Sequence, residues 1–176
     1  MEIKIRRENN GDLKEVFSLL REAFTTEDID NPEEPFLVDR LRMSDDFIPE
    51  LSLVAECEGK IVGHILLTKI KIKNKEYTFD SLALAPVSVL PEYQGKGIGG
   101  LLIKQAHKNA KKLGHKSIVL LGHENYYPRF GYQLTEKFGI HLPFEVPKEN
   151  CMAVELVEGG LKNVSGTVVY PKEFNE

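Results

Sequence analysis

Four glycines within six residues constrain the fold of this chain more than any other feature of its sequence. They lie in the stretch VLPEYQGKGIGG, residues 89–100, which follows an apolar run and precedes apolar residues at helical spacing. The sequence therefore predicts a strand, a glycine loop and a helix, in that order. Because glycine has no Cβ and the first turn of a helix has free N–H groups, we expect such a loop to bind an anion.

Two glycine signatures overlap in this stretch. Gly95, Gly97 and Gly100 fit the dinucleotide pattern G-x-G-x-x-G, whereas Gln94, Gly97 and Gly99 fit Q-x-x-G-x-G, a pyrophosphate loop of another kind. In a dinucleotide fold the glycine turn follows the first strand directly, but here the residues PEYQ and an earlier antiparallel meander intervene. A glycine-rich helix start without a ligand is the plainer alternative, although so many glycines would weaken the helix. We therefore expect a pyrophosphate loop.

The composition fits one domain that spans residues 1–176. With 41% hydrophobic residues the chain can bury one core, and its length leaves no room for the second domain of a nicotinamide oxidoreductase. The formal net charge of −4 gives no basic excess for a phosphate backbone, so we expect no nucleic-acid partner. No segment has the features of a signal peptide or a membrane span, so we expect a cytoplasmic protein with no membrane partner.

The sequence offers no metal-binding pattern. Its five histidines include no H-E-x-x-H pair, and Cys57 and Cys151 lie too far apart for the usual ligand spacing. We therefore expect no metal, and we interpret the two cysteines as free thiols in the core.

The periodicity predicts a β-α-β unit inside a mostly antiparallel sheet. Asn-Gly-Asp before residue 13 indicates a helix start, and turn residues at 58–60 and 73–75 divide a long β-rich run into three strands. The expected elements are a strand at 1–7, helices at 13–24 and 36–43, strands within 52–90, a helix at 98–113, a strand at 116–121, a helical turn at 126–130 that leads into a strand, and strands at 151–157 and 166–171.

Two motifs resemble one known family. The segment VSVLPEYQGKGIGGLLI resembles the acetyl-CoA motif of the GNAT-type N-acetyltransferases, and YYPRFGY resembles their Tyr-x-x-x-Gly-aromatic element. The pieces EPFLVDRLR, VGHILLTKI and GTVVYPKEF are similar to the YhbS-like branch, so the resemblance covers nearly the whole chain. It implies one α/β (α+β) GNAT-like domain, with a mixed, mostly antiparallel sheet of about seven strands, flanking helices, and fourth and fifth strands that splay apart at the coenzyme site.

The resemblance also implies a set of site residues. Tyr127 stands four positions before Gly131 and matches the family's general acid, while Tyr126 is its competitor. Pro86 fits a bulge in the fourth strand. The backbone at the end of that strand would pair with the pantetheine arm, and the loop would bind the pyrophosphate. The implied coenzyme-binding residues are Val87, Ser88, Val89, Gln94, Gly95, Lys96, Gly97, Ile98, Gly99 and Gly100.

The implied reaction uses acetyl-CoA as a co-substrate and no metal. A primary amine of a small molecule or a peptide would attack the thioester directly, and the resemblance leaves a homodimer open. The alternative is a regulatory module that binds acyl-CoA without turnover.

The general base and the acceptor pocket are less defined by the sequence. The position of the glutamate base of some relatives falls near Ala83, and four other candidates stay open. These are Glu56, His64, His123 and Glu124. We expect the acceptor pocket to be built from residues 27–36, the YYPRF segment and the C-terminal strands.

Overall fold

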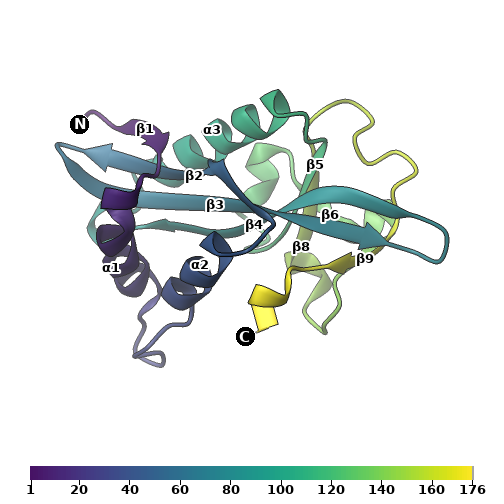
Figure 1. The fold of residues 1–176 in the computed structure, drawn as a ribbon, viewed down its shortest axis with the longest axis horizontal. Coiled ribbons are helices and arrows are strands. Elements are labelled where there is room, and N and C mark those ends of the chain that lie inside the picture. Colours follow the sequence, from purple (N-terminus) through teal and green to yellow (C-terminus); the bar gives the residue numbers. More distant parts are fainter. Residues whose placement is uncertain (176) are drawn as a thin grey trace.

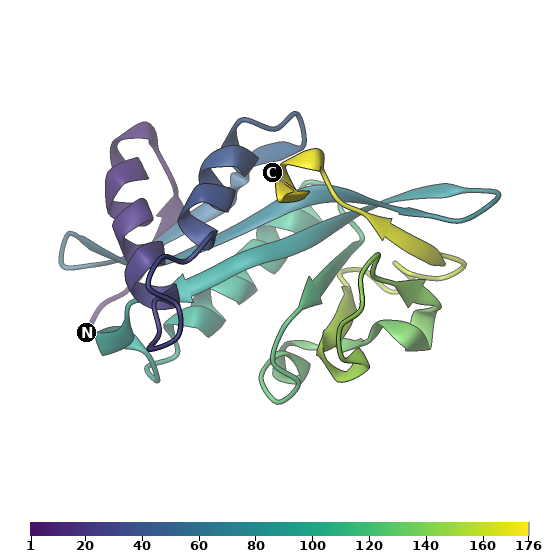
Figure 2. The ribbon, with the colours of Figure 1, turned by 90° about the horizontal axis from the view of Figure 1, so that it is seen from below.

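The computed structural model describes residues 1–175, in which nine strands form one sheet and helices lie against both of its faces (Figure 1). The helices α1 and α2 cover one face, and α3 covers the other (Figure 2). The helices are α1 (Leu13–Phe24), α2 (Glu34–Arg42) and α3 (Ile98–Lys112). The strands are β1 (Lys4–Arg7), β2 (Phe47–Cys57), β3 (Lys60–Lys73), β4 (Thr78–Val89), β5 (Ser117–Leu121), β6 (Gln133–Leu134), β7 (Ile140–His141), β8 (Cys151–Glu155) and β9 (Gly166–Val169).

The sheet has the mixed topology that the sequence predicts. The strands follow the order β1-β2-β3-β4-β5-β8-β6, and β9 pairs with the far end of β3 and with β7. The neighbours from β1 to β4 are antiparallel, whereas β5 runs parallel to β4 and is reached through α3. Seven of the strands have four or more residues, which confirms the expected number.

The boundaries differ from the expected ones in three places. The strand β2 begins at Phe47, whereas the sequence predicts a start at residue 52. The sequence does not reveal the earlier part, because exposed Pro49 and Glu50 interrupt the apolar alternation that marks a strand. The helix α2 begins at Glu34, with Pro35 in its first turn. Proline is tolerated there, because a backbone N–H in the first turn has no partner within the helix. The strand expected after residues 126–130 is β6, with only two residues, and β7, also of two residues, is too short to leave a periodic signal.

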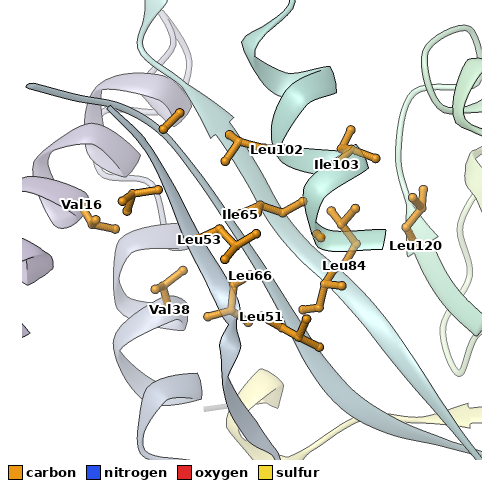
Figure 3. Close-up of a cluster of buried hydrophobic side chains, with 14 of the residues drawn as sticks. Val16, Val38, Leu51, Leu53, Ile65, Leu66, Leu84, Leu102, Ile103 and Leu120 are labelled. Atoms are coloured by element: carbon orange, nitrogen blue, oxygen red, sulfur yellow. The ribbon is translucent and has the colours of Figure 1, made fainter. Parts of the chain in front are cut away.

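The core lies on both faces of β3 (Figure 3). Leu53, Ile65 and Leu66 are almost fully buried between the sheet and the helices. Gly63 lets α3 approach the sheet closely, because a Cβ at this position would lie 3.0 Å from Leu102 Cδ1. Since the same helix begins at the glycine loop, this contact also fixes the loop over the end of β4. Within residues 1–175, no helix has the length and hydropathy needed to cross a membrane.

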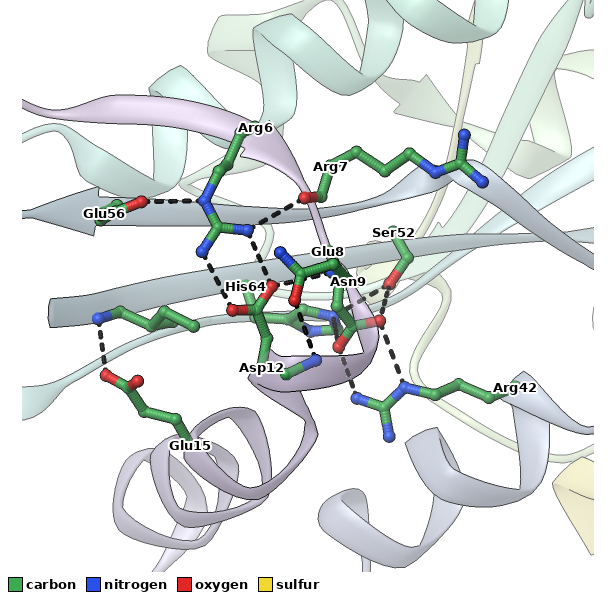
Figure 4. A network of polar contacts seen from close by, with 12 residues as sticks. Arg6, Arg7, Glu8, Asn9, Asp12, Glu15, Arg42, Ser52, Glu56 and His64 are labelled. Carbon is green, nitrogen blue, oxygen red and sulfur yellow. Dashed lines mark hydrogen bonds and ion pairs between the residues drawn. The ribbon is translucent and has the colours of Figure 1, made fainter. Parts of the chain in front are cut away.

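A buried polar network fastens α2 to the sheet (Figure 4). Arg42 of α2 lies 2.6 Å from Glu8, and Ser52 Oγ donates to the same carboxylate at 2.8 Å. His64 Nε2 lies 3.2 Å from Ser52 Oγ. The side chains of Arg42 and Glu8 are only 11% and 5% exposed. If one partner were removed, little solvent could reach the other charge to replace it.

The protonation states of this network follow from burial and from Arg42. Burial lowers the pKa of His64 to about 4, so its 3.7 Å contact with Glu8 is not an ion pair at neutral pH. Burial is the largest single influence on the pKa of Glu8 and would raise it, but the hydrogen bond and charge of Arg42, together with His64 and the Ser52 hydroxyl, lower it overall. Glu8 is therefore a carboxylate whose charge Arg42 balances.

We predict that Arg42→Met destabilises the fold by about 3 kcal/mol, because it leaves the Glu8 carboxylate buried without a cation. Denaturant unfolding measures the change. The control is Lys60→Met, which removes the exposed Lys60–Glu92 contact at 3.6 Å and should change the free energy of unfolding by less than about 1 kcal/mol. Equal losses in the two variants would contradict a dominant role for the buried pair.

Candidate functional site

The strands β4 and β5 separate shortly after they begin to pair. Their ladder joins Leu82 to Ile118 and Ala83 to Val119, and β4 then continues to Val89 with no described strand on that edge. A bulge marks the separation, because Leu66 of β3 faces two residues of β4, Ala85 and Pro86. Pro86 thus occupies the bulge that the sequence predicts for it, where the missing N–H breaks no ladder bond.

The register turns the backbone of β4 toward the opened edge. The Leu90 N–H donates to Val62 O, the residue directly opposite, at 2.9 Å. Because bonded pairs alternate in an antiparallel ladder, Ser88 bonds to β3, whereas Val87 and Val89 direct their N–H and C=O groups away from it. The Gln94 side chain donates to the Val89 carbonyl at 3.0 Å and ties the glycine loop to this strand end.

Two of the loop glycines have backbone conformations that favour glycine. Gly95 has a φ of 78° and Gly97, the residue before α3, a φ of 83°. No heavy atom lies within 4 Å of the Cβ position at either residue, so the loop is open on the side where a side chain would stand. At these two positions the loop before α3 is therefore open, next to the free N–H groups of the first helical turn.

The other two glycines allow a close approach of aromatic rings. A Cβ at Gly99 would lie 2.8 Å from the Tyr126 hydroxyl, and one at Gly100 would lie 3.4 Å from the Phe130 ring. Tyr126 and Phe130 thus form a wall beside the loop, with ring centroids 5.3 Å apart.

Basic residues line the cavity over the glycine loop, which has a volume of about 520 Å³. Lys104 of α3 and Arg129 belong to this lining, and neither was identified from the sequence. Lys96, which the sequence indicates, instead lies with its Nζ 5.3 Å from the centre of the Tyr93 ring and outside the lining. The fold thus brings Lys104 and Arg129 to the cavity, in addition to the charge of Lys96 in the loop itself.

A larger cavity of about 860 Å³ occupies the gap between β4 and β5. Residues 83–87 of β4 and 119–121 of β5 form its floor. Phe24 and Leu37 close it from the side of α1 and α2, and the C-terminal residues 167–170 close it from the other side. Of the segments expected to build the acceptor pocket, residues 27–36 contribute Glu34, the YYPRF segment contributes Tyr127, and the C-terminal strands contribute residues 167–170 to this cavity.

Tyr127 and Tyr126 lie on different cavities. Tyr127 lines the larger cavity, whereas Tyr126 lines the cavity over the loop. The Tyr127 ring packs edge-on against Tyr126 and Tyr132, at 5.0 and 5.8 Å between centroids, and Tyr132 is held by His107 of α3 at 2.8 Å. Burial raises the pKa of Tyr127 to about 12, so the phenol keeps its proton at neutral pH.

Gly122 controls where the Tyr127 ring can lie. A Cβ at residue 122, just after β5, would stand 2.3 Å from Tyr127 Cε2. The position has no positive φ, so the need for glycine comes from this contact alone. The sequence analysis missed it, because a single glycine after a strand has no pattern that would reveal it.

None of the four candidate bases lines the larger cavity. Glu56 is bonded to Arg6 at 2.8 Å, and His64 belongs to the buried network of Glu8. His123 Nδ1 accepts from the Asn125 N–H in an exposed turn, which also contains Glu124.

Few ionisable groups line the larger cavity. The position near Ala83, where some relatives carry a glutamate, lies in its floor without an ionisable group. Among residues 1–175, Glu34 is the one carboxylate of the lining.

The cysteines and potential metal ligands add nothing to the site. Cys57 and Cys151 are buried and free, as predicted. Over the described range, no three His, Cys, Asp or Glu side chains come close enough to hold a metal ion.

Comparisons with known sequences agree with the geometry. A family model described as an acetyltransferase (GNAT) domain matches residues 4–135. The *Escherichia coli* K12 protein named uncharacterized N-acetyltransferase YjhQ is 39% identical over 119 residues, which are 67% of this chain and 66% of YjhQ. Uncharacterized N-acetyltransferase YhbS of the same strain is 27% identical over 172 residues, 97% of this chain and 98% of YhbS.

Two solved structures resemble the whole chain. The GNAT family N-acetyltransferase YhbS from *Escherichia coli*, solved in complex with CoA, has a TM-score of 0.88 at 25% identity and covers 100% of this chain and 93% of its own. A GNAT family acetyltransferase from *Brucella melitensis*, solved in complex with acetyl-CoA, has a TM-score of 0.78 at 31% identity and covers 98% of each chain.

We predict that Gly122→Ala displaces the Tyr127 ring and destabilises the protein by about 1–3 kcal/mol, because the added methyl overlaps the ring. Thermal unfolding measures the loss, and a crystal structure of the variant locates the ring. Gly100→Ala is the control, since its methyl would make only an ordinary 3.4 Å contact. If Tyr127 keeps its wild-type position in the Gly122 variant, residue 122 does not determine where the ring lies, and the prediction is wrong.

Proposed function

The chain belongs to the GNAT acetyltransferase family, and on this premise we propose that it transfers the acetyl group of acetyl-CoA to a primary amine of a small molecule or a peptide. Two relatives of the same fold were solved with CoA and with acetyl-CoA, which supports the choice of co-substrate. The single domain over residues 1–176 and the cytoplasmic location stay predictions, and a homodimer stays open.

The observation that carries the proposal is the open edge of β4, which runs from the glycine loop to the cavity that contains Tyr127. Val89 lines the first cavity and Val87 the second. An extended pantetheine arm can therefore pair with this backbone as an added strand would, and reach Tyr127 with its thioester.

The loop is suited to the pyrophosphate. The N–H groups from Gly95 to Gly100 lie at the start of α3, where the helix dipole favours an anion. Lys104 and Arg129 add positive charge in the same cavity. We assign Gln94 a positioning part, because its side chain already holds the Val89 carbonyl.

The proposed reaction is direct acyl transfer. The neutral amine attacks the thioester carbonyl carbon, the C–N bond forms, and the C–S bond breaks as the electron pair leaves with sulfur. Tyr127 donates its proton to this sulfur and is reprotonated from solvent, while the amine releases one proton to water. The products are an amide and CoA. Burial raises the pKa of Tyr127 to about 12, so its hydroxyl carries the proton that this step requires throughout the neutral range.

The alternative is a regulatory module that binds acyl-CoA without turnover. The position of a protonated tyrosine in the cavity favours the enzyme. Release of free thiol from acetyl-CoA in the presence of an amine panel tests the choice. Binding of acetyl-CoA without thiol release from any amine would support the module instead.

We predict that Gly97→Val weakens acetyl-CoA binding at least about tenfold, because the side chain fills the open side of the loop and disfavours its positive φ. Calorimetry gives the affinity. The control is Gly114→Val at the other end of α3, where φ is also positive at 93° and the space is equally open. If both variants bind acetyl-CoA as the wild type does, the phosphates lie elsewhere.

We predict that Tyr127→Phe lowers kcat by about 10²–10⁴-fold and leaves acetyl-CoA affinity nearly unchanged, since it removes only the proton donor. Steady-state kinetics with the best amine of the panel measures both effects. Tyr126→Phe is the matched control and should act mildly, because its ring lies on the loop cavity. A wild-type kcat in the Tyr127 variant, with chemistry shown to be rate-limiting, would reduce this tyrosine to a wall of the pocket.

A further inference from the structure

The larger cavity has a wall of aromatic rings that the acetyl-CoA site does not require. Phe144, Tyr170 and Phe174 form a continuous row along the cavity. The rings of Phe144 and Tyr170 are stacked, 5.9 Å apart and 18° from parallel, and Tyr170 contacts Phe174 at 4.9 Å. All three come from the C-terminal part of the chain, and none of them lines the cavity over the glycine loop.

The rim of the same cavity exposes apolar side chains. Phe144 and Val169 are each 47% exposed and Leu121 is 46% exposed, although residues of this kind are usually buried. All three line the cavity. Such a concentration of exposed apolar side chains at one opening is typical of a binding surface for an apolar group.

One carboxylate stands among these apolar side chains. Glu34 is half-buried at the start of α2 and lines the cavity. No Lys, Arg or His among the described residues belongs to the lining. The neighbouring Glu33 is different, because it lies outside the lining and pairs with Arg40 at 2.8 Å. The cavity therefore attracts a cation through Glu34 alone.

Resting on the proposed function, we propose that the acceptor is a primary amine carried on an aromatic or apolar body. Glu34 attracts the ammonium form before the amine loses its proton to water, and the row Phe144–Tyr170–Phe174 contacts the body. A polyamine or a sugar amine fits poorly, because its further polar groups would lie against apolar walls without hydrogen-bond partners.

An extended acyl chain is the competing occupant of the apolar wall. An acyl chain would leave Glu34 without a role. Its carboxylate would be desolvated by the alkyl chain and would gain no hydrogen-bond or ionic partner. An amine with an apolar body accounts for both the charge and the wall, so the structure favours the amine.

The first experiment compares amines that carry an aromatic body with amines of similar basicity that are hydrophilic throughout. We expect kcat/KM for phenethylamine and tryptamine to exceed that for ethanolamine and spermidine by at least about tenfold, since burial of an aromatic body contributes more than 1.4 kcal/mol. A second series, with acetyl-, butyryl- and hexanoyl-CoA, should show no gain in affinity with chain length.

The second experiment uses matched variants and separates KM from kcat. Glu34→Gln should raise KM for phenethylamine about tenfold and change kcat little, whereas Glu33→Gln should change neither. Phe144→Ala should remove most of the preference for phenethylamine over ethanolamine. Its control is Tyr77→Ala, which truncates a ring that is 62% exposed in the β3–β4 hairpin, outside the cavity.

The outcomes separate this inference from the proposed function. Equal kcat/KM for aromatic and hydrophilic amines would overturn the inference while acetyl transfer stands. Affinity that rises with acyl length would overturn it as well and assign the wall to the acyl group. If acetyl-CoA raises the melting temperature but no amine releases thiol, the proposed function fails and the inference fails with it.

Discussion

Backbone pairing between β4 and β5 ends at Ala83 and Val119. Had the ladder continued, β5 would cover the backbone of Val87 and Val89 and close the cavity that Tyr127 lines. The bulge at Pro86 makes the separation compatible with an intact β3–β4 ladder, because β3 keeps its pairing on both sides of it. One interrupted ladder thus provides both an exposed strand edge and the gap beside it.

Glycines then let three parts of the molecule approach one another at this gap. Gly63 leaves space for Leu102, so α3 packs closely on the sheet. Gly99 leaves space for the Tyr126 hydroxyl, and Gly122 leaves space for the Tyr127 ring. At these positions the requirement is space for a neighbour and not an unusual φ, since none of the three has a positive φ. Close packing of rings on the backbone therefore positions the proposed acid against the loop and the opened strand.

The charged groups divide into a structural set and a set at the cavities. The network of Arg42, Glu8, Ser52 and His64 holds α2 to the sheet through contacts among its own members, although the buried Nδ1 of His64 has no hydrogen-bond partner. The cavities instead have isolated charges. Lys104 and Arg129 lie over the loop and Glu34 lies beside the aromatic row, an arrangement that suits an anionic coenzyme at one end and a cationic acceptor at the other.

The sequence alone predicts the strand, loop and helix around residues 89–100 and the β-α-β unit, and it contains the Tyr-x-x-x-Gly element at Tyr127. Periodicity and glycine spacing are local, so they can be recognised without the fold. The fold is needed to see that His64 and Glu56 belong to structural networks and that Gly122 makes room for Tyr127. The fold also brings the rings of Phe144, Tyr170 and Phe174 together and places Glu34 in the lining of the same cavity. These contacts join segments far apart in the chain, and no periodic pattern encodes which distant side chains will share a cavity.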